Sequence, residues 1–223
     1  MSWPRPKNRR PKLGTDSVLP HNTKGHAPDT PAYVDLVFDR GVPTTVNGVA
    51  MPLVELVASL ETIAGAHGVG RIDMVENRLV GIKSREIYEA PAAVVLHAAH
   101  RELESLVIPR DLERIKAGLS PVYADLVYNG LWFTPTRRAI DALVADVQQH
   151  VTGSVRLKLF KGNCRVVGRK SPYALYKESL ATYDEGDEFD HDAAVGFIKI
   201  WGLPVELAAE KTASLTGAST PDA

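Results

Sequence analysis

Apolar and polar residues alternate along several short segments of the chain, which predicts β-strands with one buried face. Residues 33–38 and 155–159 each place an apolar side chain at every second position. The pair Asn47-Gly48 lies between two further strand-like stretches, 44–46 and 49–51. Because asparagine and glycine readily adopt positive φ, this pair predicts the tight turn of a hairpin.

Other segments repeat their apolar residues at helical spacing. Residues 53–64 carry such a stripe behind Pro52, which suits the first helical position, and a glycine at 65 or 68 ends it. Further helices are expected over 92–106, 110–128 and 135–150.

Proline and capping residues refine these helices. Pro91 opens one helix, and Thr134-Pro135 is an N-cap and first-turn pair for another. Ser120-Pro121 predicts a break within its helix. Asp190 or Asp192 is expected to cap a last helix that runs through Trp201.

Strands and helices recur without strict βαβ alternation, so the predicted class is α+β: a mixed or antiparallel sheet with packed helices and a C-terminal helical arm. We expect a disordered, basic and Pro-rich arm over residues 1–30 and a folded domain over 31–203. A C-terminal arm with a frayed end is expected over 204–223, with a short helix over 205–215 behind Pro204. The N-terminal arm would be a linker remnant or translated leader, or else a tail for an anionic partner.

Composition narrows the function classes. Apolar residues make up 44% of the chain, charged residues 24%, and the net charge is -1, as in ordinary globular proteins. This balance favours neither nucleic acid nor a membrane as a partner. Cys164 is the single cysteine, which excludes an intrachain disulfide and fits a reducing compartment. No apolar run approaches the length of a membrane span, so cytoplasmic localisation is expected.

The densest cluster of polar residues lies between Gly68 and Pro91, where two strands are expected over 71–76 and 78–83. A strand buried in a core has little use for so many charged side chains, so this segment indicates a site for a polar small molecule. Glu76 would share a face with Met74 and Arg78, which leaves its carboxylate partly desolvated. It then needs a cationic partner, either a ligand ammonium group or a neighbouring arginine.

Weaker candidates have simpler explanations. Gly68-Val69-Gly70 follows a helix and precedes a strand, the reverse of a dinucleotide fingerprint, so it is interpreted as a helix stop. His97 and His100 lack the further ligands of a zinc site, and Cys164 is expected to be a small buried hydrophobe. The acidic run 184–192 lacks the order of a calcium loop and is interpreted as a solvated loop.

A basic hairpin is expected where residues 161–163 turn the strand at 155–160 back along 164–168. Single-stranded nucleic acid is conceivable there, but the neutral net charge favours a solvated face or a subunit contact. The basic residues concerned are Lys158, Lys161, Arg165, Arg169 and Lys170.

Several segments resemble argininosuccinate synthase, in the order of that family. The first is V-E-N-R-L-V-G-I-K-S-R-E-I-Y-E-A-P, Val75 to Pro91. The resemblance covers about residues 29–203, and several long segments in order are more specific than one short motif. The other four are S-P-V-Y-A-D-L-V-Y-N-G-L-W-F-T-P (120–135), V-T-G-S-V-R-L-K-L-F-K-G-N (151–163), G-R-K-S-P-Y-A-L-Y (168–176) and D-A-A-V-G-F-I-K-I (192–200).

The resemblance implies a carbon–nitrogen ligase of arginine biosynthesis. In this family ATP, with Mg²⁺, adenylates citrulline, and the amine of aspartate then displaces AMP to give argininosuccinate. It further implies that Glu76 and Tyr88 contact citrulline, the carboxylate through the ammonium group and the phenol through its hydroxyl and ring. Pairing of Glu76 with Arg78 or Arg71 is the alternative.

The chain also departs from the family. The S-G-G-x-D-S phosphate loop and the T-G-K-G-N-D segment of the family's nucleotide-binding domain have no counterpart, and Lys161-Gly162-Asn163 belongs to a hairpin instead. Ala92-Ala93 stands where the family often has glycine. We therefore expect a synthetase domain that carries part of the citrulline site and is inactive alone.

Two other functions stay open. A separate ATP-binding half is a possible partner that would restore activity. Alternatively, the chain is a non-catalytic self-association module, since this domain and its arm build the homotetramer of the family. Nucleic-acid binding through the basic cluster 5–12 is a more distant option.

Overall fold

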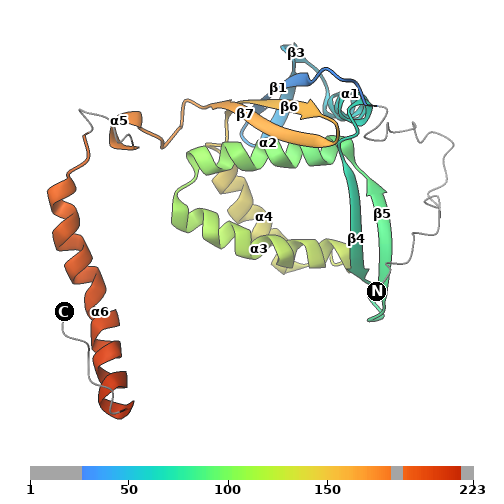
Figure 1. The fold of residues 1–223 in the computed structure, drawn as a ribbon. Helices are drawn as coiled ribbons and strands as arrows, with labels where there is room; N and C mark the ends of the chain where they lie inside the picture. The colour runs from blue at the N-terminus through green and yellow to red at the C-terminus, as the bar shows by residue number, and fades with distance from the viewer. Residues whose placement is uncertain (1–26, 182–187, 217–223) are drawn as a thin grey trace. The chain divides into compact units, whose positions relative to one another are not determined.

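The computed structural model describes residues 27–181 and 188–216 (Figure 1). The chain divides into two units, the first ending at Leu175 and the second beginning at Tyr176. The first unit contains β1 (Ala32–Asp39), β2 (Val42–Val46), β3 (Val49–Ala50), α1 (Leu53–Ala66), β4 (Arg71–Asn77), β5 (Lys83–Glu89), α2 (Pro91–Val107), α3 (Arg110–Tyr128), α4 (Pro135–Gln148), β6 (Gly153–Phe160) and β7 (Asn163–Lys170). The second contains α5 (Glu178–Ala181) and α6 (His191–Thr216). The α+β class predicted from the sequence is confirmed.

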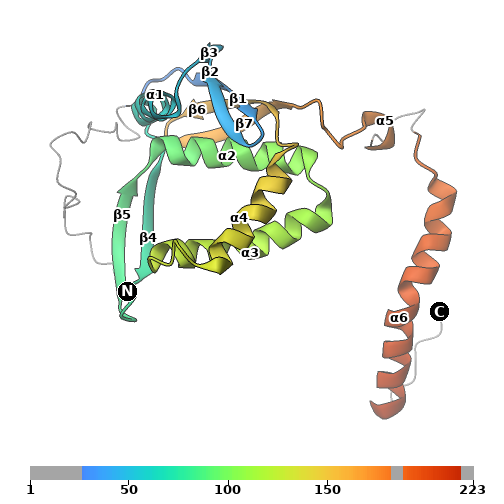
Figure 2. The same ribbon diagram turned by 180° about the vertical axis from the view of Figure 1, so that it is seen from behind.

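Five strands form an antiparallel sheet in the order β3-β2-β1-β6-β7, seen from both sides in Figure 1 and Figure 2. The alternation predicted for 33–38 and 155–159 is confirmed, because every second residue of each strand is buried and apolar, and Leu36 pairs with Val155. The buried residues are Val34, Leu36, Phe38, Val155, Leu157 and Leu159. The predicted hairpin turn is confirmed as well: Asn47 and Gly48 have φ values of 50° and 80°. Asn47 also accepts a hydrogen bond from the Asp35 backbone amide through Oδ1, which ties the turn to the sheet.

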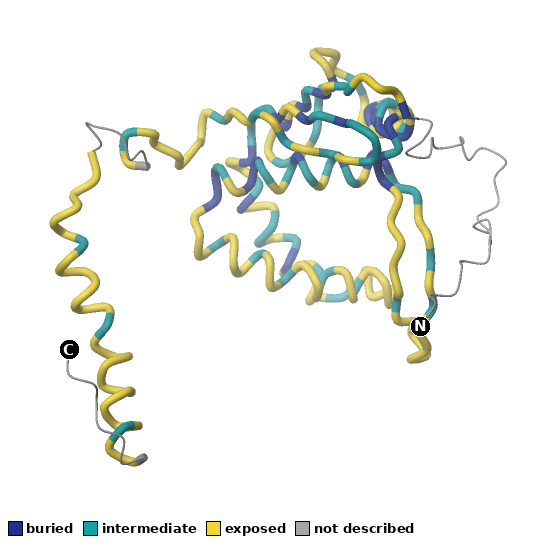
Figure 3. The backbone as a smooth tube through the Cα atoms, in the orientation of Figure 1, coloured by how far each residue is buried: buried dark blue, intermediate teal, exposed yellow. Residues whose placement is uncertain are grey.

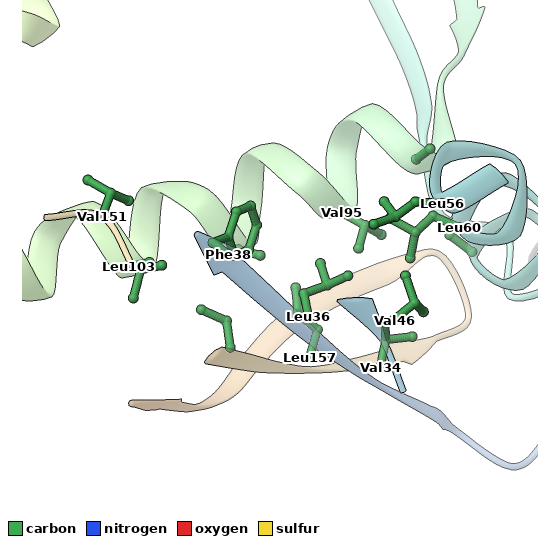
Figure 4. Close-up of a cluster of buried hydrophobic side chains, with 14 of the residues drawn as sticks. Val34, Leu36, Phe38, Val46, Leu56, Leu60, Val95, Leu103, Val151 and Leu157 are labelled. Atoms are coloured by element: carbon green, nitrogen blue, oxygen red, sulfur yellow. The ribbon is translucent and has the colours of Figure 1, made fainter. Parts of the chain in front are cut away.

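The core lies between this sheet and the helices α1 and α2. Helix α2 packs on β6 and β7, and α1 packs on β2 and α2. Buried positions gather there, whereas α3 has no buried residue and is mostly exposed (Figure 3). Leu56 and Leu60 of α1 face the sheet beside Val95 of α2 (Figure 4). Each such side chain contributes about 1.5–3 kcal/mol when fully removed from water.

One prediction about α3 is wrong, and one prediction about the start of α4 is confirmed. The break expected at Ser120-Pro121 is wrong, because α3 continues through the proline. The proline leaves the backbone carbonyl of Ala117 without its helical donor, but Ala117 is exposed and water can supply one. The predicted N-cap is confirmed: Oγ1 of Thr134 accepts a hydrogen bond from the Arg137 amide.

Strands β4 and β5 form a separate antiparallel ribbon, which extends away from the five-stranded sheet (Figure 1). The second strand expected over 78–83 is wrong, because β5 begins only at Lys83. Residues 78–82 are a turn in which the Arg78 amide donates to the Ile82 carbonyl and Gly81 has a φ of 84°. Its apolar residues suggested a strand, yet Leu79 and Val80 are 75% and 79% exposed.

The second unit consists mainly of α6, which runs unbroken through Pro204. The helical arm expected over 205–215 is helical, but it continues α6 and does not start anew after Pro204. The expected boundary at 203–204 therefore falls inside this helix. The predicted cap is confirmed for Asp190, whose Oδ1 accepts a hydrogen bond of 3.1 Å from the Ala193 amide. Most described side chains of α6 are exposed (Figure 3).

Several expectations concern residues outside those described. They are the basic arm over 1–26, the acidic residues at 184–187 and the tail at 217–223. Within 27–181 and 188–216, no helix combines the length and the apolar character needed to cross a bilayer.

Candidate functional site

The β4–β5 ribbon sorts its polar residues onto two faces. The register pairs Ile72 with Tyr88, Met74 with Glu86 and Glu76 with Ser84. These pairs alternate with those of the opposite face, so the predicted sharing of one face by Met74 and Glu76 is confirmed. The two residues proposed from the sequence, Glu76 and Tyr88, therefore lie on the same side of the ribbon.

Glu76 is the centre of this face, and its side chain is only 18% exposed. The Tyr88 hydroxyl donates a hydrogen bond of 2.8 Å to Oε2, and the Ser84 hydroxyl lies 3.3 Å from Oε1 as a second donor. Nε of Arg78 also lies 3.3 Å from Oε1, so the alternative in which Glu76 pairs with Arg78 is confirmed. This carboxylate is thus partly removed from water, as expected, and it contacts both a phenol and an arginine.

Arg78 is shared among several partners on this face. Its Nη2 donates to Oε1 of Glu86 at 2.6 Å, and its Nε donates to the Ser84 hydroxyl at 2.9 Å. One guanidinium thus lies between the two carboxylates of Glu76 and Glu86. The three charged groups leave one net negative charge on this face, which suits a cationic head group.

The Glu76 carboxylate favours the protonated form of the Tyr88 phenol. Its hydrogen bond to the Glu76 carboxylate raises the pKa of Tyr88 above the ordinary value of 10, and burial and the negative charge of Glu76 act in the same direction. A phenol is protonated at neutral pH in any case, and the raised pKa keeps Tyr88 protonated to higher pH. Tyr88 acts on this face as a hydrogen-bond donor with 39% of its surface exposed.

Ion pairs and hydrogen bonds on the opposite face hold the ribbon in register. Arg85 forms a bidentate pair with Asp73, which lowers the pKa of the Asp73 carboxyl and raises that of the Arg85 guanidinium. Arg71 pairs with Glu89 at 2.7 Å, so the alternative in which Arg71 pairs with Glu76 is wrong. These cross-strand contacts fix which residues meet Glu76.

Sequence analysis missed Ser84 as a neighbour of Glu76. Misplacing the second strand at 78–83 hid the pairing of Glu76 with Ser84, because register follows from the turn. The signal was Gly81, whose lack of a side chain favours the turn observed at 78–82. The base of the ribbon is Gly70, which has a φ of 99° and accepts a hydrogen bond from the Ala90 amide through its carbonyl. The sequence indicated only a helix stop at this glycine.

A second polar cluster lies beside a pocket of about 450 Å³ between α2, α3, α4 and the β1–β2 turn. Its centre is Glu104, which is buried and accepts hydrogen bonds from Lys116 at 3.0 Å and Gln148 at 2.6 Å. His100 contacts Gln148 at 2.9 Å and packs edge-on against Phe38. This cluster joins three helices, and it places His100 in a structural role.

The remaining residues singled out from the sequence are either partly buried or held in ion pairs. Cys164 is half-buried on β7, and burial raises the pKa of its thiol to about 11. On the basic hairpin, Arg169 pairs with Glu102 and Lys161 with Asp29, each at 2.6 Å. Among the residues that the structure describes, no group of three or more His, Cys, Asp or Glu could hold a metal ion.

Comparison with known proteins gives the family. Residues 19–208 match the family described as the arginosuccinate synthase C-terminal domain. An argininosuccinate synthase of Symbiobacterium thermophilum is 59% identical over 82% of this chain and 46% of its own length. Those of Rubrobacter xylanophilus and Gloeobacter violaceus are 59% and 57% identical, over 44% and 46% of their lengths.

The chain thus spans less than half the length of the curated relatives that it matches. The family match covers both the β4–β5 ribbon and most of α6. Because the match covers most of its described length, the chain belongs to the argininosuccinate synthase family and corresponds to that family's C-terminal domain.

Proposed function

We propose that this chain is the C-terminal part of an argininosuccinate synthase, and that the Glu76 face of the ribbon binds citrulline. The observation that carries the proposal is the hydrogen bond between Tyr88 and Glu76, which brings together the two residues that the family resemblance implies. The net negative charge of this face suits the ammonium group of an amino acid.

The same proposal includes ATP, with Mg²⁺, and aspartate as co-substrates. In the relatives, these would be held mainly by the part of the protein that this chain does not match. The described residues do not fit a triphosphate, because their glycines with positive φ lie in hairpin turns, at helix ends and at the starts of strands. We assign no step of ATP chemistry to them. The chain alone is expected to release no diphosphate from ATP.

Calorimetric titration of the chain with citrulline tests the ribbon site. The wild-type chain should bind saturably, and Glu76→Gln should weaken binding about tenfold or more, because it removes the charge that pairs with the ammonium group. Asp73→Asn is the matched control on the opposite face of the same ribbon and should change the affinity less than about twofold.

The same titration is repeated with the purified N-terminal half of the Symbiobacterium relative present. With ATP and aspartate added, the mixture should form argininosuccinate. Failure of the wild-type chain to bind citrulline in both titrations, or equal binding by Glu76→Gln, contradicts the proposal.

A self-association module is the second candidate, and one observation favours it. Helix α6 exposes large apolar side chains along its length, including Trp201 at 74%, and Phe197 stacks on Trp201. Such a surface is typical of a helix that packs against another chain. Sedimentation of the chain should show an oligomer that Trp201→Glu dissociates, whereas a wild-type monomer at high concentration removes this candidate. The exposed apolar residues between 195 and 207 are Val195, Phe197, Ile198, Ile200, Trp201, Leu203, Val205 and Leu207.

A further inference from the structure

We propose that Ser84 is a positioning residue, whose hydroxyl takes the Nε proton of Arg78 and so keeps Arg78 from hydrogen-bonding to the Glu76 carboxylate, which stays available to a ligand ammonium group. This inference rests on the proposed citrulline site and adds a residue to it. It follows from the hydrogen bonds of the ribbon face, where three side chains meet around one hydroxyl oxygen.

Proton positions give the first step. Nε of Arg78 carries a single proton, and it donates this proton to Oγ of Ser84 at 2.9 Å. The same Nε lies 3.3 Å from Oε1 of Glu76, so the two groups form an ion pair, but the Nε proton is donated to Ser84 and not to the carboxylate. The hydroxyl therefore takes the proton that would otherwise go to the carboxylate.

The Ser84 hydroxyl then directs its own proton. Because its oxygen accepts from Arg78, its single proton can be donated to Oε1 of Glu76, which lies 3.3 Å away. A hydroxyl that accepts from a charged donor is polarised and becomes a better donor itself. Glu76 thus receives a neutral hydroxyl at Oε1 and a neutral phenol at Oε2.

Two neutral donors fix the plane of the carboxylate without cancelling its charge. Each carboxylate oxygen can accept two hydrogen bonds, so one site on each oxygen stays open for a ligand. Arg78 is held at its other end by Glu86, through Nη2 at 2.6 Å. Ser84 and Glu86 together restrain the guanidinium, and a hydrogen bond from Arg78 to Glu76, in addition to the ion pair at 3.3 Å, would compete with the ammonium group.

The backbone explains why Ser84 occupies this place. Antiparallel pairing puts Ser84 directly opposite Glu76, and the turn at 78–82 returns Arg78 to the same face. A serine side chain at this position reaches both Nε of Arg78 and Oε1 of Glu76 with its hydroxyl. Alanine at this position would leave the guanidinium free to move onto Glu76.

Variants of the full chain test this arrangement through citrulline titration. Ser84→Ala should weaken citrulline binding about tenfold, because the Nε proton of Arg78 is then free to hydrogen-bond to Glu76. Adding Arg78→Gln to that variant should restore most of the affinity, since the competing cation is gone. Ser84→Thr keeps the hydroxyl and should bind within about twofold of the wild type. Ser105→Ala, an exposed serine on α2, is the matched control and should be neutral.

A merely structural role for Ser84 predicts a different pattern. It would lower the melting temperature of Ser84→Ala, and Arg78→Gln would deepen the loss of affinity instead of reversing it. Equal citrulline binding by the wild type and Ser84→Ala, or no recovery in the double variant, overturns the inference while leaving the proposed function intact.

A readout without citrulline separates the two proposals. NMR titration of the Tyr88 phenol should show a lower pKa in Ser84→Ala than in the wild type, because the guanidinium moves toward the Glu76–Tyr88 pair, and a higher one again after Arg78→Gln is added. An unchanged Tyr88 titration in Ser84→Ala overturns the role of Ser84 even if the wild-type chain binds no citrulline.

Discussion

The Tyr88 hydroxyl donates a 2.8 Å hydrogen bond to Oε2 of Glu76 and so joins β5 to β4 across one face of the ribbon. The two residues are not directly paired in register, since Glu76 lies opposite Ser84 and Tyr88 opposite Ile72. The length of the tyrosine side chain spans this diagonal. A contact between residues twelve positions apart thus unites the two residues that the proposed citrulline site requires.

Glu76→Gln should return the pKa of the Tyr88 phenol toward its ordinary value. The hydrogen bond to a charged carboxylate raises this pKa in the folded chain, and a neutral amide removes most of the effect. Because the folded pKa is raised, its contribution to stability is complete below pH about 10 and is lost as the pH rises through the folded value. NMR titration of selectively labelled tyrosine measures the shift.

The control for this titration is Asp73→Asn. Asp73 pairs with Arg85 on the opposite face of the ribbon, so its replacement should leave the Tyr88 titration in place. A wild-type Tyr88 that titrates at its ordinary value would show that the phenol does not donate to Glu76 in solution.

Gly70→Ala should destabilise the chain by about 2 kcal/mol more than Gly81→Ala. Both glycines have positive φ, 99° and 84°, so both alanines carry a similar backbone strain. A Cβ at Gly70 would lie 2.4 Å from the backbone of Pro91, whereas the space around Gly81 is open. The added cost at Gly70 is steric, because neither backbone segment can move without breaking the Gly70–Ala90 hydrogen bond.

Chemical denaturation of the two glycine variants measures the difference in the free energy of unfolding. Faster amide exchange at Ala90 in Gly70→Ala alone would locate the damage at the base of the ribbon. Equal losses in the two variants would mean that backbone strain, and not the contact with Pro91, decides the effect.

Lys116→Met should lower the free energy of unfolding by about 2 kcal/mol, because it leaves the buried carboxylate of Glu104 without its cation. The Gln148 hydrogen bond remains and limits the loss. Arg114→Met is the matched control, since Arg114 is an exposed cation on the same helix. A loss for Lys116→Met no larger than for Arg114→Met would assign the Lys116–Glu104 pair no role in holding α3 to α2.

The elements predicted correctly from the sequence are those whose conformation depends on their own residues. The apolar alternation of β1 and β6 and the turn at Asn47-Gly48 depend on local patterns, and all three are present. The expected breaks at Pro121 and Pro204 are wrong, because most of α3 and α6 is exposed and water can satisfy the carbonyl that each proline frees.

The candidate site was predictable only in part. The shared face of Met74 and Glu76 follows from strand periodicity, and the roles of Glu76 and Tyr88 came from the family resemblance. The place of Ser84 depends on cross-strand register, which a single misplaced strand boundary changes throughout. A residue whose role depends on its partner on the neighbouring strand, such as Ser84, is therefore missed when only the pattern along the sequence is considered.

Cys164 should react with iodoacetamide at pH 8 about a hundred times more slowly than an exposed cysteine. Burial on β7 raises the pKa of its thiol to about 11, so roughly one molecule in a thousand carries the reactive thiolate at that pH. A free cysteine with a pKa of about 8.5 is roughly one-quarter thiolate under the same conditions. Mass spectrometry follows the label without ambiguity, because the chain has a single cysteine. Unfolding in guanidinium chloride is the control and should restore the fast rate. Fast labelling of the folded chain would show that β7 opens readily and that Cys164 does not pack against the core.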